Sequence, residues 1–126
     1  MKRVRVLLAA ALTMPAMLHA SQAWSADAVR GQDLYESRCG ACHSVDASRV
    51  GPAHKGVFGR KAGSVADYDY SPAVKASGIV WTEQTLDRWL SDPEKTIPGQ
   101  KMNYSVPDEQ DRLDVIAYLK KVSVKP

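Results

Sequence analysis

The sequence has few of the features that mark the common fold and binding classes. No run of alternating apolar and polar residues is long enough to predict a β-strand, and no segment repeats. The only cysteines are Cys39 and Cys42, and a bond between them would enclose two residues and remove little chain entropy. The sequence therefore argues against a β-sheet domain and against a domain stabilised by disulfides.

The longest apolar run is also short for a membrane-spanning segment. It covers residues 6–18, whereas a spanning helix needs about 20 residues. Basic residues precede the run and a zone of small residues follows it, which is the pattern of a secretory signal peptide. We therefore expect cleavage after Ala23, within a few residues either way, so that residues 1–23 are removed and residues 24–126 form a single domain.

The expected mature chain has no excess of either charge. Removing the three basic residues among residues 1–23 lowers the 17 lysines and arginines to 14, which equals the 14 aspartates and glutamates. A near-neutral domain argues against nucleic acid as a partner. The same cleavage leaves one methionine, Met102, and two histidines, His43 and His54.

Apolar periodicity and capping residues predict three main helices and one short helix. The main helices are expected at residues 27–38, 82–90 and 108–121, and the short helix at residues 71–77. Asp27, Ser71 and Thr82 are suited to cap the first turns of their helices. The segments 43–70 and 91–107 are rich in glycine and proline, so we expect long loops there. This pattern predicts an all-α domain whose loops surround something that the helices do not fill.

The motif CGACH, residues 39–43, contains most of the candidate chemistry. Cys-x-x-Cys-His is the attachment signature of c-type haem. Each thiol can add to one vinyl group of a haem, and the adjacent imidazole is then placed to ligate the iron. The motif therefore predicts Cys39 and Cys42 as covalent attachment points and His43 as an axial iron ligand.

Other uses of this motif fit the sequence less well. A zinc site needs four ligands, often from a second Cys or His pair, and only His54 remains outside the motif in the mature chain. A thioredoxin-like dithiol is expected in a βαβ setting, and no strands are predicted here. A further interpretation is that His43 is an ordinary surface histidine beside two cysteines. Haem is the cofactor that the motif favours.

The chain between residues 31 and 121 resembles the class I cytochromes c, in particular the mitochondrial-type branch as found in bacteria. Five pieces occur in the order of the family: CGACH, GPAHKGVFGR, YSPAVKASGIVW, TLDRWLSDPEKTIPGQKM and DVIAYLKK. The resemblance implies a small cytochrome c fold, in which the helices wrap around one covalently bound haem c. It also implies haem attachment outside the cytoplasm, which places an exported chain in the bacterial periplasm.

The resemblance also implies the second axial ligand. Met102 lies in IPGQKM, which is similar to the loop that carries the axial methionine of the family. A methionine paired with a histidine raises the haem potential and suits electron transfer. Two alternatives stay open. Met102 could instead fill a gap in the core, and His54 could be the sixth ligand and lower the potential.

Several further residues match family positions around the haem. The resemblance implies that the carbonyl of Pro52 accepts a hydrogen bond from the histidine ligand. It implies that Arg60, Tyr70 and Trp81 hydrogen-bond or offset the charge of the haem propionates, which need partners when they are buried. Trp89 stands where the family commonly has a tyrosine near the methionine sulfur. As alternatives, Tyr70 and Trp81 could be ordinary core residues, and Arg60 a solvated charge.

Other matches and departures concern the surroundings of the site. The resemblance implies that the first and last helices cross at three residues, where a glycine permits close approach: Gly31, Tyr35 and Tyr118. The chain departs from the family at three further positions, where leucine, threonine and phenylalanine are usual: His54, Gln100 and Tyr104. Because of these departures, the hydrogen bonding around the iron and the reduction potential cannot be copied from the family.

Taken together, these observations predict a soluble periplasmic electron carrier whose iron alternates between the ferrous and ferric states. We expect a monomer without enzymatic activity or a small-molecule substrate. Its partners would be redox proteins that dock transiently at the haem edge, with Lys55 and Lys101 as candidate contacts. Two alternatives are a haem enzyme or ligand sensor with a weak or open sixth position, and a dedicated partner of one periplasmic oxidoreductase.

Overall fold

The computed structural model describes residues 24–124, so the predicted signal peptide lies outside the described residues. Within this part of the chain, five helices follow one another: α1 (Ala28–Arg38), α2 (Pro72–Ala76), α3 (Glu83–Ser91), α4 (Pro93–Thr96) and α5 (Glu109–Lys121). The same residues contain no strand, only one isolated antiparallel bridge between Lys61 and Val80. None of these helices is long and apolar enough to cross a membrane. The all-α prediction is confirmed.

The predicted capping residues begin their helices as expected. The Asp27 side chain accepts hydrogen bonds from two amides in the first turn of α1. The Ser71 hydroxyl accepts from the Val74 amide at the start of α2. Thr82 and Thr85 form a capping box at the start of α3, in which each side chain bonds the backbone of the other residue. Short polar side chains therefore fix where these helices begin.

The sequence analysis missed α4, which occupies part of the predicted loop 91–107. The Asp92 side chain accepts from the Lys95 amide at 2.9 Å, and Pro93 is the first residue of the helix. A helix of four residues is too short to show an apolar period. The sequence pair Asp92-Pro93 predicts the end of α3, and in the structure the same pair also begins α4.

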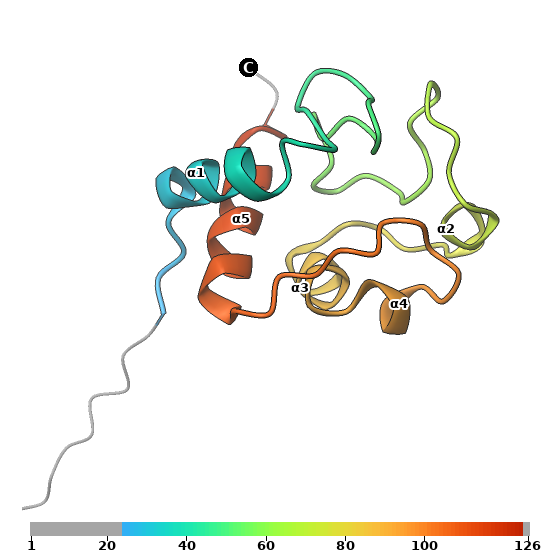
Figure 1. The fold of residues 1–126 in the computed structure, drawn as a ribbon. Coiled ribbons are helices and arrows are strands. Elements are labelled where there is room, and N and C mark those ends of the chain that lie inside the picture. Colours follow the sequence, from blue (N-terminus) through green and yellow to red (C-terminus); the bar gives the residue numbers. More distant parts are fainter. Residues whose placement is uncertain (1–23, 125–126) are drawn as a thin grey trace, which may run out of the picture.

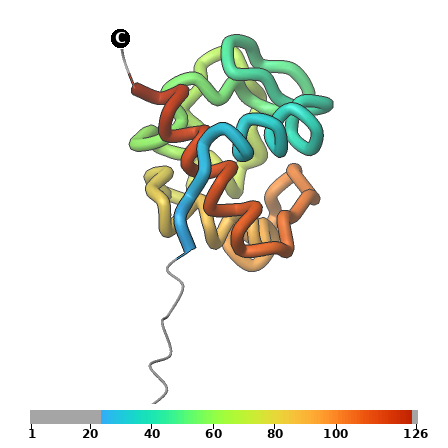
Figure 2. Tube along the Cα trace, turned by 90° about the vertical axis from the view of Figure 1, so that its left-hand side faces the viewer, coloured from blue at the N-terminus to red at the C-terminus, as the bar shows by residue number. Residues whose placement is uncertain are grey.

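Helices α1 and α5 cross closely and form one half of the domain (Figures 1 and 2). A Cβ atom on Gly31 would lie 1.9 Å from the carbonyl oxygen of Asp114, so only glycine fits at this contact. The rings of Tyr35 and Tyr118 pack beside it, with centroids 5.2 Å apart. The predicted structural role of Gly31, Tyr35 and Tyr118 is confirmed.

One face of α5 differs from the apolar face that its sequence predicts. The apolar spacing of Leu113, Ile116, Tyr118 and Leu119 predicts that all four face inward, but Leu113 is only partly buried. Three charged residues of the helix are buried instead: Asp111, Arg112 and Asp114. Apolar periodicity could not predict them, because their partners lie on other elements.

Asp114 is 1% exposed and is held by donors from both helices. Its carboxylate accepts from the Asp27 amide at 2.8 Å, from the Gln110 side chain at 2.8 Å, and from the Arg30 guanidinium. Burial by itself raises the pKa of Asp114, but these donors outweigh it and hold the pKa below its usual value. The buried charge is thus fully compensated within the chain.

The other half of the domain consists of α2, α3, α4 and the long loop after α1 (Figure 1). Arg112 of α5 joins the halves. It donates to Asp87 of α3 at 2.7 Å and to the carbonyls of Val106 and Pro107 at 3.0 and 2.8 Å. These bonds fix the end of the 97–107 segment, which faces the 43–70 loop across the centre of the molecule.

Candidate functional site

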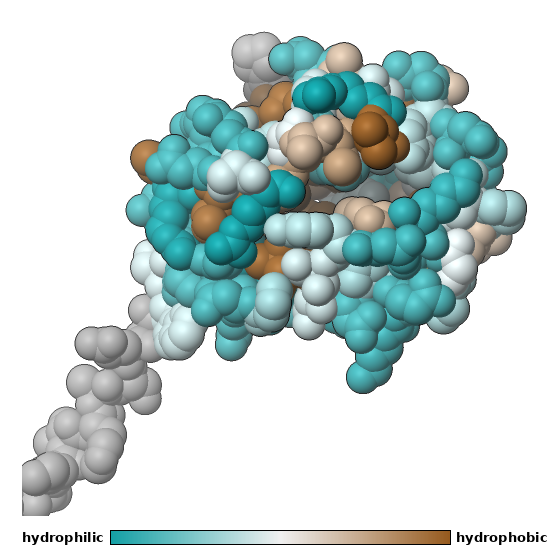
Figure 3. Space-filling view, viewed as in Figure 1, coloured by the Kyte–Doolittle hydropathy of each residue, from teal (hydrophilic) through white to brown (hydrophobic). Residues whose placement is uncertain are grey.

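A cavity of about 340 Å³ lies between these segments and opens to the surface. Figure 3 shows the hollowed face, with apolar residues at the hollow and polar residues over much of the surface around it. Buried apolar side chains from several elements line the interior: Val57, Val74, Leu86, Leu90, Val115 and Leu119. A concave, mainly apolar site with few polar groups is typical of a bound cofactor.

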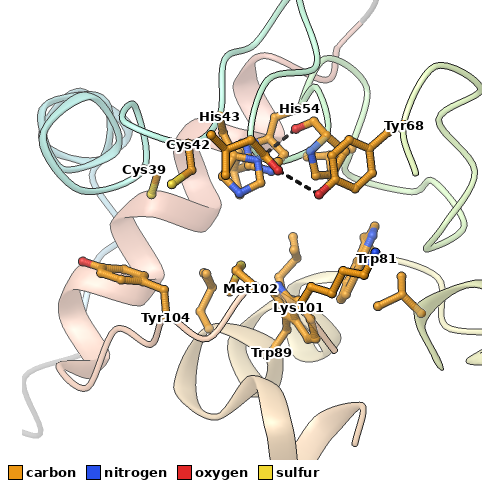
Figure 4. A pocket seen from close by; sticks show the side chains of 18 of the residues that line it. Cys39, Cys42, His43, His54, Tyr68, Trp81, Trp89, Lys101, Met102 and Tyr104 are labelled. Atoms are coloured by element: carbon orange, nitrogen blue, oxygen red, sulfur yellow. Dashed lines mark hydrogen bonds between the residues drawn. The ribbon is translucent and has the colours of Figure 1, made fainter. Parts of the chain in front are cut away.

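Every residue that the sequence analysis assigned to a haem site lines this cavity: Cys39, Cys42, His43, Pro52, Arg60, Tyr70, Trp81, Trp89 and Met102. Figure 4 shows Cys39, Cys42 and His43 along one side, with Trp89 and Met102 on the opposite side. The fold thus brings two thiols, an imidazole and a thioether to one apolar space.

The two thiols lie directly after α1. The turn that carries them is closed by hydrogen bonds from the amides of Cys42 and His43 to the carbonyl of Cys39, at 3.1 and 2.8 Å. Both cysteines are free, with Cys39 partly buried and Cys42 exposed. Burial raises the pKa of Cys39 to about 11, so its thiol is protonated at neutral pH. Two unpaired thiols on one turn are available to bond a common partner.

His43 is oriented by its neighbours on the loop. Its Nδ1 lies 2.9 Å from the carbonyl oxygen of Pro52. Because a carbonyl only accepts, Nδ1 carries the hydrogen and Nε2 keeps a free lone pair. Burial lowers the pKa of His43, although the bond to Pro52 opposes this. A Cβ atom on Gly51 would lie 2.2 Å from Cε1 of the ring, so glycine is needed there. The imidazole is neutral, fixed and able to ligate a metal.

His54 lies on the same side of the cavity as His43 (Figure 4). The two rings stack with centroids 4.1 Å apart and planes 20° apart. Nδ1 of His54 lies 2.9 Å from the Tyr35 hydroxyl. Burial, with His43 and Arg60 nearby, lowers the pKa of His54 to about 3. Since a sixth ligand must approach from the side opposite His43, this position argues against His54 in that role.

Met102 lies in irregular chain between α4 and α5, on the side of the cavity opposite His43 (Figure 4). It is partly buried, and it does not belong to the hydrophobic core of the described residues. The interpretation of Met102 as a gap-filling core residue is therefore not supported. Its thioether is a weak hydrogen-bond acceptor and can act as a soft ligand to a metal.

Arg60 tests whether the polar part of the cavity fits a haem. Its two terminal nitrogens donate to the carbonyls of Lys55 and Ala53, both at 2.9 Å. Its Nε is buried and has no partner within the described residues. The Tyr70 oxygen accepts from the Val65 amide at 3.3 Å, which leaves its own hydrogen to donate. Burial lowers the pKa of Arg60. A carboxylate in the cavity would satisfy both donors, as the propionates of a haem require.

Comparison with known proteins identifies the family. A family model described as cytochrome c matches residues 28–123. The chain belongs to the cytochrome c family. The resemblance to class I cytochromes c and the predicted fold are confirmed, as is covalent haem c as the cofactor, since Cys39 and Cys42 fit the motif of the family. The protein is accordingly a haem-based electron carrier.

Individual relatives cover most of the described chain. Cytochrome c of Euglena viridis is 46% identical over 97 residues, which are 75% of this chain and 95% of that protein. Cytochrome c of Gibberella zeae is 44% identical over 98 residues, covering 75% of this chain and 92% of that protein. The structure of cytochrome cH from Methylobacterium extorquens superposes with a TM-score of 0.72 at 44% identity, covering 75% of this chain and 98% of that chain.

Sequence reasoning missed part of the cavity wall. The Tyr68 hydroxyl donates to the Val50 carbonyl at 2.8 Å, and its ring packs edge-on against Tyr70 with centroids 4.8 Å apart. Both Val50 and Tyr68 line the cavity. Nothing in the sequence separates Tyr68 from an ordinary loop tyrosine, because its contacts depend on how the 43–70 loop folds back on itself.

Proposed function

We propose that this cytochrome c is a periplasmic electron carrier in which Cys39 and Cys42 attach the haem and His43 and Met102 ligate its iron. The observation that carries the proposal is the convergence of these four side chains on one apolar cavity. His43, with Nε2 free, and Met102 lie on opposite sides of that cavity, as two axial ligands require (Figure 4).

Attachment by the two cysteines needs no oxidant. Each thiol would add across one vinyl group of the haem, with its sulfur on one carbon and its hydrogen on the other, so that no atom or electron is left over. Cys39 and Cys42 lie on the turn that leads directly to His43, so the same short segment would hold the haem by both thiols and supply the first ligand of its iron. This explains why the attachment residues and the ligand are adjacent in sequence.

The remaining residues of the cavity would tune and shield the site. When bound, haem c supplies an iron that takes up and releases one electron. With both His43 and Met102 bound to it, the iron would have no free coordination position for a small molecule, so we propose no enzymatic activity. The apolar lining excludes water, and Arg60 and Tyr70 pair with the propionates.

Location and partners complete the proposal. A basic start, a short apolar run and a small-residue zone support export of the chain and removal of residues 1–23. N-terminal sequencing of the protein from a periplasmic extract should begin near Trp24. A protein that keeps residues 1–23 in cells would contradict the export proposal.

We propose a monomer that meets redox proteins transiently at the mouth of the cavity, where Lys101 lies.

The test of ligation is spectroscopic. Oxidised protein at neutral pH should show the weak absorbance band at the red edge that marks methionine–iron ligation. Met102→Ala should keep covalent haem, lose this band and have a lower reduction potential, because a thioether ligand raises the potential. If the wild-type band is missing and carbon monoxide binds the ferrous form rapidly, the site has an open position and the proposed ligation is wrong.

A further inference from the structure

Gln100 is the buried polar residue that the proposed function does not use. It lies two positions before Met102, and it is 7% exposed. Its Oε1 accepts from the amide of Met102 at 2.5 Å and from the amide of Asn103 at 3.0 Å. Its Nε2 donates to Oε2 of Glu94 at 3.1 Å and to Oδ1 of Asn103 at 2.9 Å. Both ends of the side-chain amide are therefore fully engaged.

Glu94 extends this network to a helix. Its second oxygen, Oε1, accepts from the Gly99 amide at 3.0 Å. Glu94 lies in the first turn of α4, which is itself capped by Asp92. The carboxylate thus holds the loop just before Gln100, and Gln100 holds it just after. Together they connect α4 to the segment that carries Met102.

The backbone around Met102 has little other support. Within the described chain, no backbone–backbone hydrogen bond involves residues 101–105; the nearest are from the amide of Gln100 and from the amide of Val106. Asn103 has a φ of +47°, the only positive φ outside glycine among residues 24–124. A left-handed conformation is unfavourable for most side chains and needs compensating bonds. Here the bonds to Asn103 come from Gln100.

We infer that Gln100 is a positioning residue that keeps the Met102 thioether directed into the cavity. Its side chain supplies to residues 102 and 103 the hydrogen bonds that a helix or strand would supply through the backbone. Without it, the segment would leave the cavity more often and the sixth position would open. This inference rests on the proposed ligation by Met102.

The experiment compares ligand exchange in two matched variants of the ferric holoprotein. Gln100→Leu removes every hydrogen bond of the side chain. Gln32→Leu makes the same change at a partly buried position of α1, far from Met102 in sequence, where the one side-chain bond found among the described residues goes to Glu36. Imidazole is added, and absorbance gives both its apparent affinity and its binding rate at saturating imidazole concentration. The saturating rate reports how often Met102 leaves the iron. We expect Gln100→Leu to raise both values at least tenfold and Gln32→Leu to stay within twofold of wild type.

A second readout separates positioning from a general loss of stability. Hydrogen exchange of the Met102 and Asn103 amides should become at least tenfold faster in Gln100→Leu, while exchange in α1 and α5 stays close to wild type. If Gln100→Leu does not fold, Glu94→Ala removes the other end of the network and should raise imidazole affinity in the same direction.

The outcomes distinguish this inference from the proposed function. If the wild-type protein has the methionine band but Gln100→Leu binds imidazole within twofold of wild type, the inference is wrong and ligation by Met102 stands. The same holds for an unchanged Glu94→Ala where Gln100→Leu cannot be made. If wild type lacks the band, the ligand assignment fails, and the positioning role fails with it.

Discussion

The α1–α5 crossing and the central cavity show opposite ways of burying polar groups. At the crossing, Asp114 is 1% exposed and receives donors from Asp27, Gln110 and Arg30. At the cavity, Nε of Arg60 is buried with no partner among residues 24–124, and the thiols of Cys39 and Cys42 are free. The buried carboxylate at the crossing finds its hydrogen-bond partners within the chain. The cavity wall instead has polar and apolar surface that a bound group would cover.

This difference indicates which part of the fold depends on the cofactor. A buried donor without a partner and an unfilled apolar cavity are both costly to the folded state. A covalently bound haem would remove both costs at once. We therefore expect contacts within the chain to stabilise the α1–α5 crossing. We expect the haem to be the main source of stability for the other half, residues 43–107, which we call the cavity half.

Removing both attachment thiols should have the largest effect. We expect Cys39→Ala with Cys42→Ala to retain no covalent haem after acid extraction. Since a tightly held ligand can add about 4 kcal/mol or more to stability, the denaturant midpoint should fall steeply. Hydrogen exchange should show the greatest loss of protection in residues 43–107 and a smaller loss in α1 and α5. Uniform loss over both halves would contradict the comparison.

The single variant Cys42→Ala serves as the control for attachment. It keeps Cys39, so at most one thioether can form. The pyridine haemochrome spectrum should shift to the one-thioether form while haem stays bound. An unshifted spectrum would show that Cys42 is not an attachment point.

A methyl group at the crossing should be the next largest perturbation. In Gly31→Ala the new Cβ would lie 1.9 Å from the Asp114 carbonyl oxygen, so α1 and α5 must separate. Overpacking of this kind costs about 1–3 kcal/mol. The denaturant midpoint of the holoprotein should fall accordingly, while the haem spectrum stays unchanged because Gly31 does not line the cavity. Asp33→Ala, at an exposed position of the same helix, should have a much smaller effect.

Acid should weaken the crossing through Asp114. Its pKa in the folded state is lowered, so its stabilising contribution is complete above the unfolded value of about 3.9. The contribution is lost as the pH falls through the lowered folded-state pKa. Asp114→Asn should therefore be less stable than wild type at pH 7, by about 1–3 kcal/mol for a disrupted buried bond, and the gap should narrow below about pH 4. Denaturant unfolding of both proteins at pH 7 and in acid measures this difference in stability. A difference that widens in acid would show that folding does not lower the pKa of Asp114.

The smallest effect is expected at Arg60, and it concerns potential more than stability. In the holoprotein, Arg60→Leu removes a positive charge beside the propionates, which favours the ferric form and lowers the reduction potential. Loss of its hydrogen bonds should cost about 1 kcal/mol. A potentiometric titration measures the change, with the exposed Lys61→Leu as a control. A potential equal to or above wild type would mean that Arg60 does not face the propionates.

Much of this architecture could be predicted because the signals are local. Asp27 and Thr82 begin helices through their own side chains, and the CGACH motif contains its chemistry within five residues. Met102 could be selected because cleavage would leave no other methionine. Residues whose partners are distant gave no such signal. Asp114 depends on donors from α1, and the contacts of Tyr68 depend on the fold of a loop.

His54 and Gln100 show the limit of a resemblance. Both depart from the family, so family positions implied nothing about their contacts. His54 stacks on His43 and lies within hydrogen-bond distance of the Tyr35 hydroxyl, and the Gln100 side chain accepts from the amides of Met102 and Asn103. The general site was predictable from the motif, but the hydrogen bonds that distinguish this chain required the structure.

The placement of the three tryptophans gives the two halves separate optical signals. Trp81 and Trp89 line the cavity with ring centroids 5.5 Å apart, whereas Trp24 precedes α1 and is 61% exposed. A haem absorbs where tryptophan emits, so it should quench the cavity pair by energy transfer. In a Trp24→Phe background, recovery of fluorescence during unfolding would therefore report opening of the cavity, and circular dichroism would follow all the helices, of which α5 and α1 are the longest in the described chain.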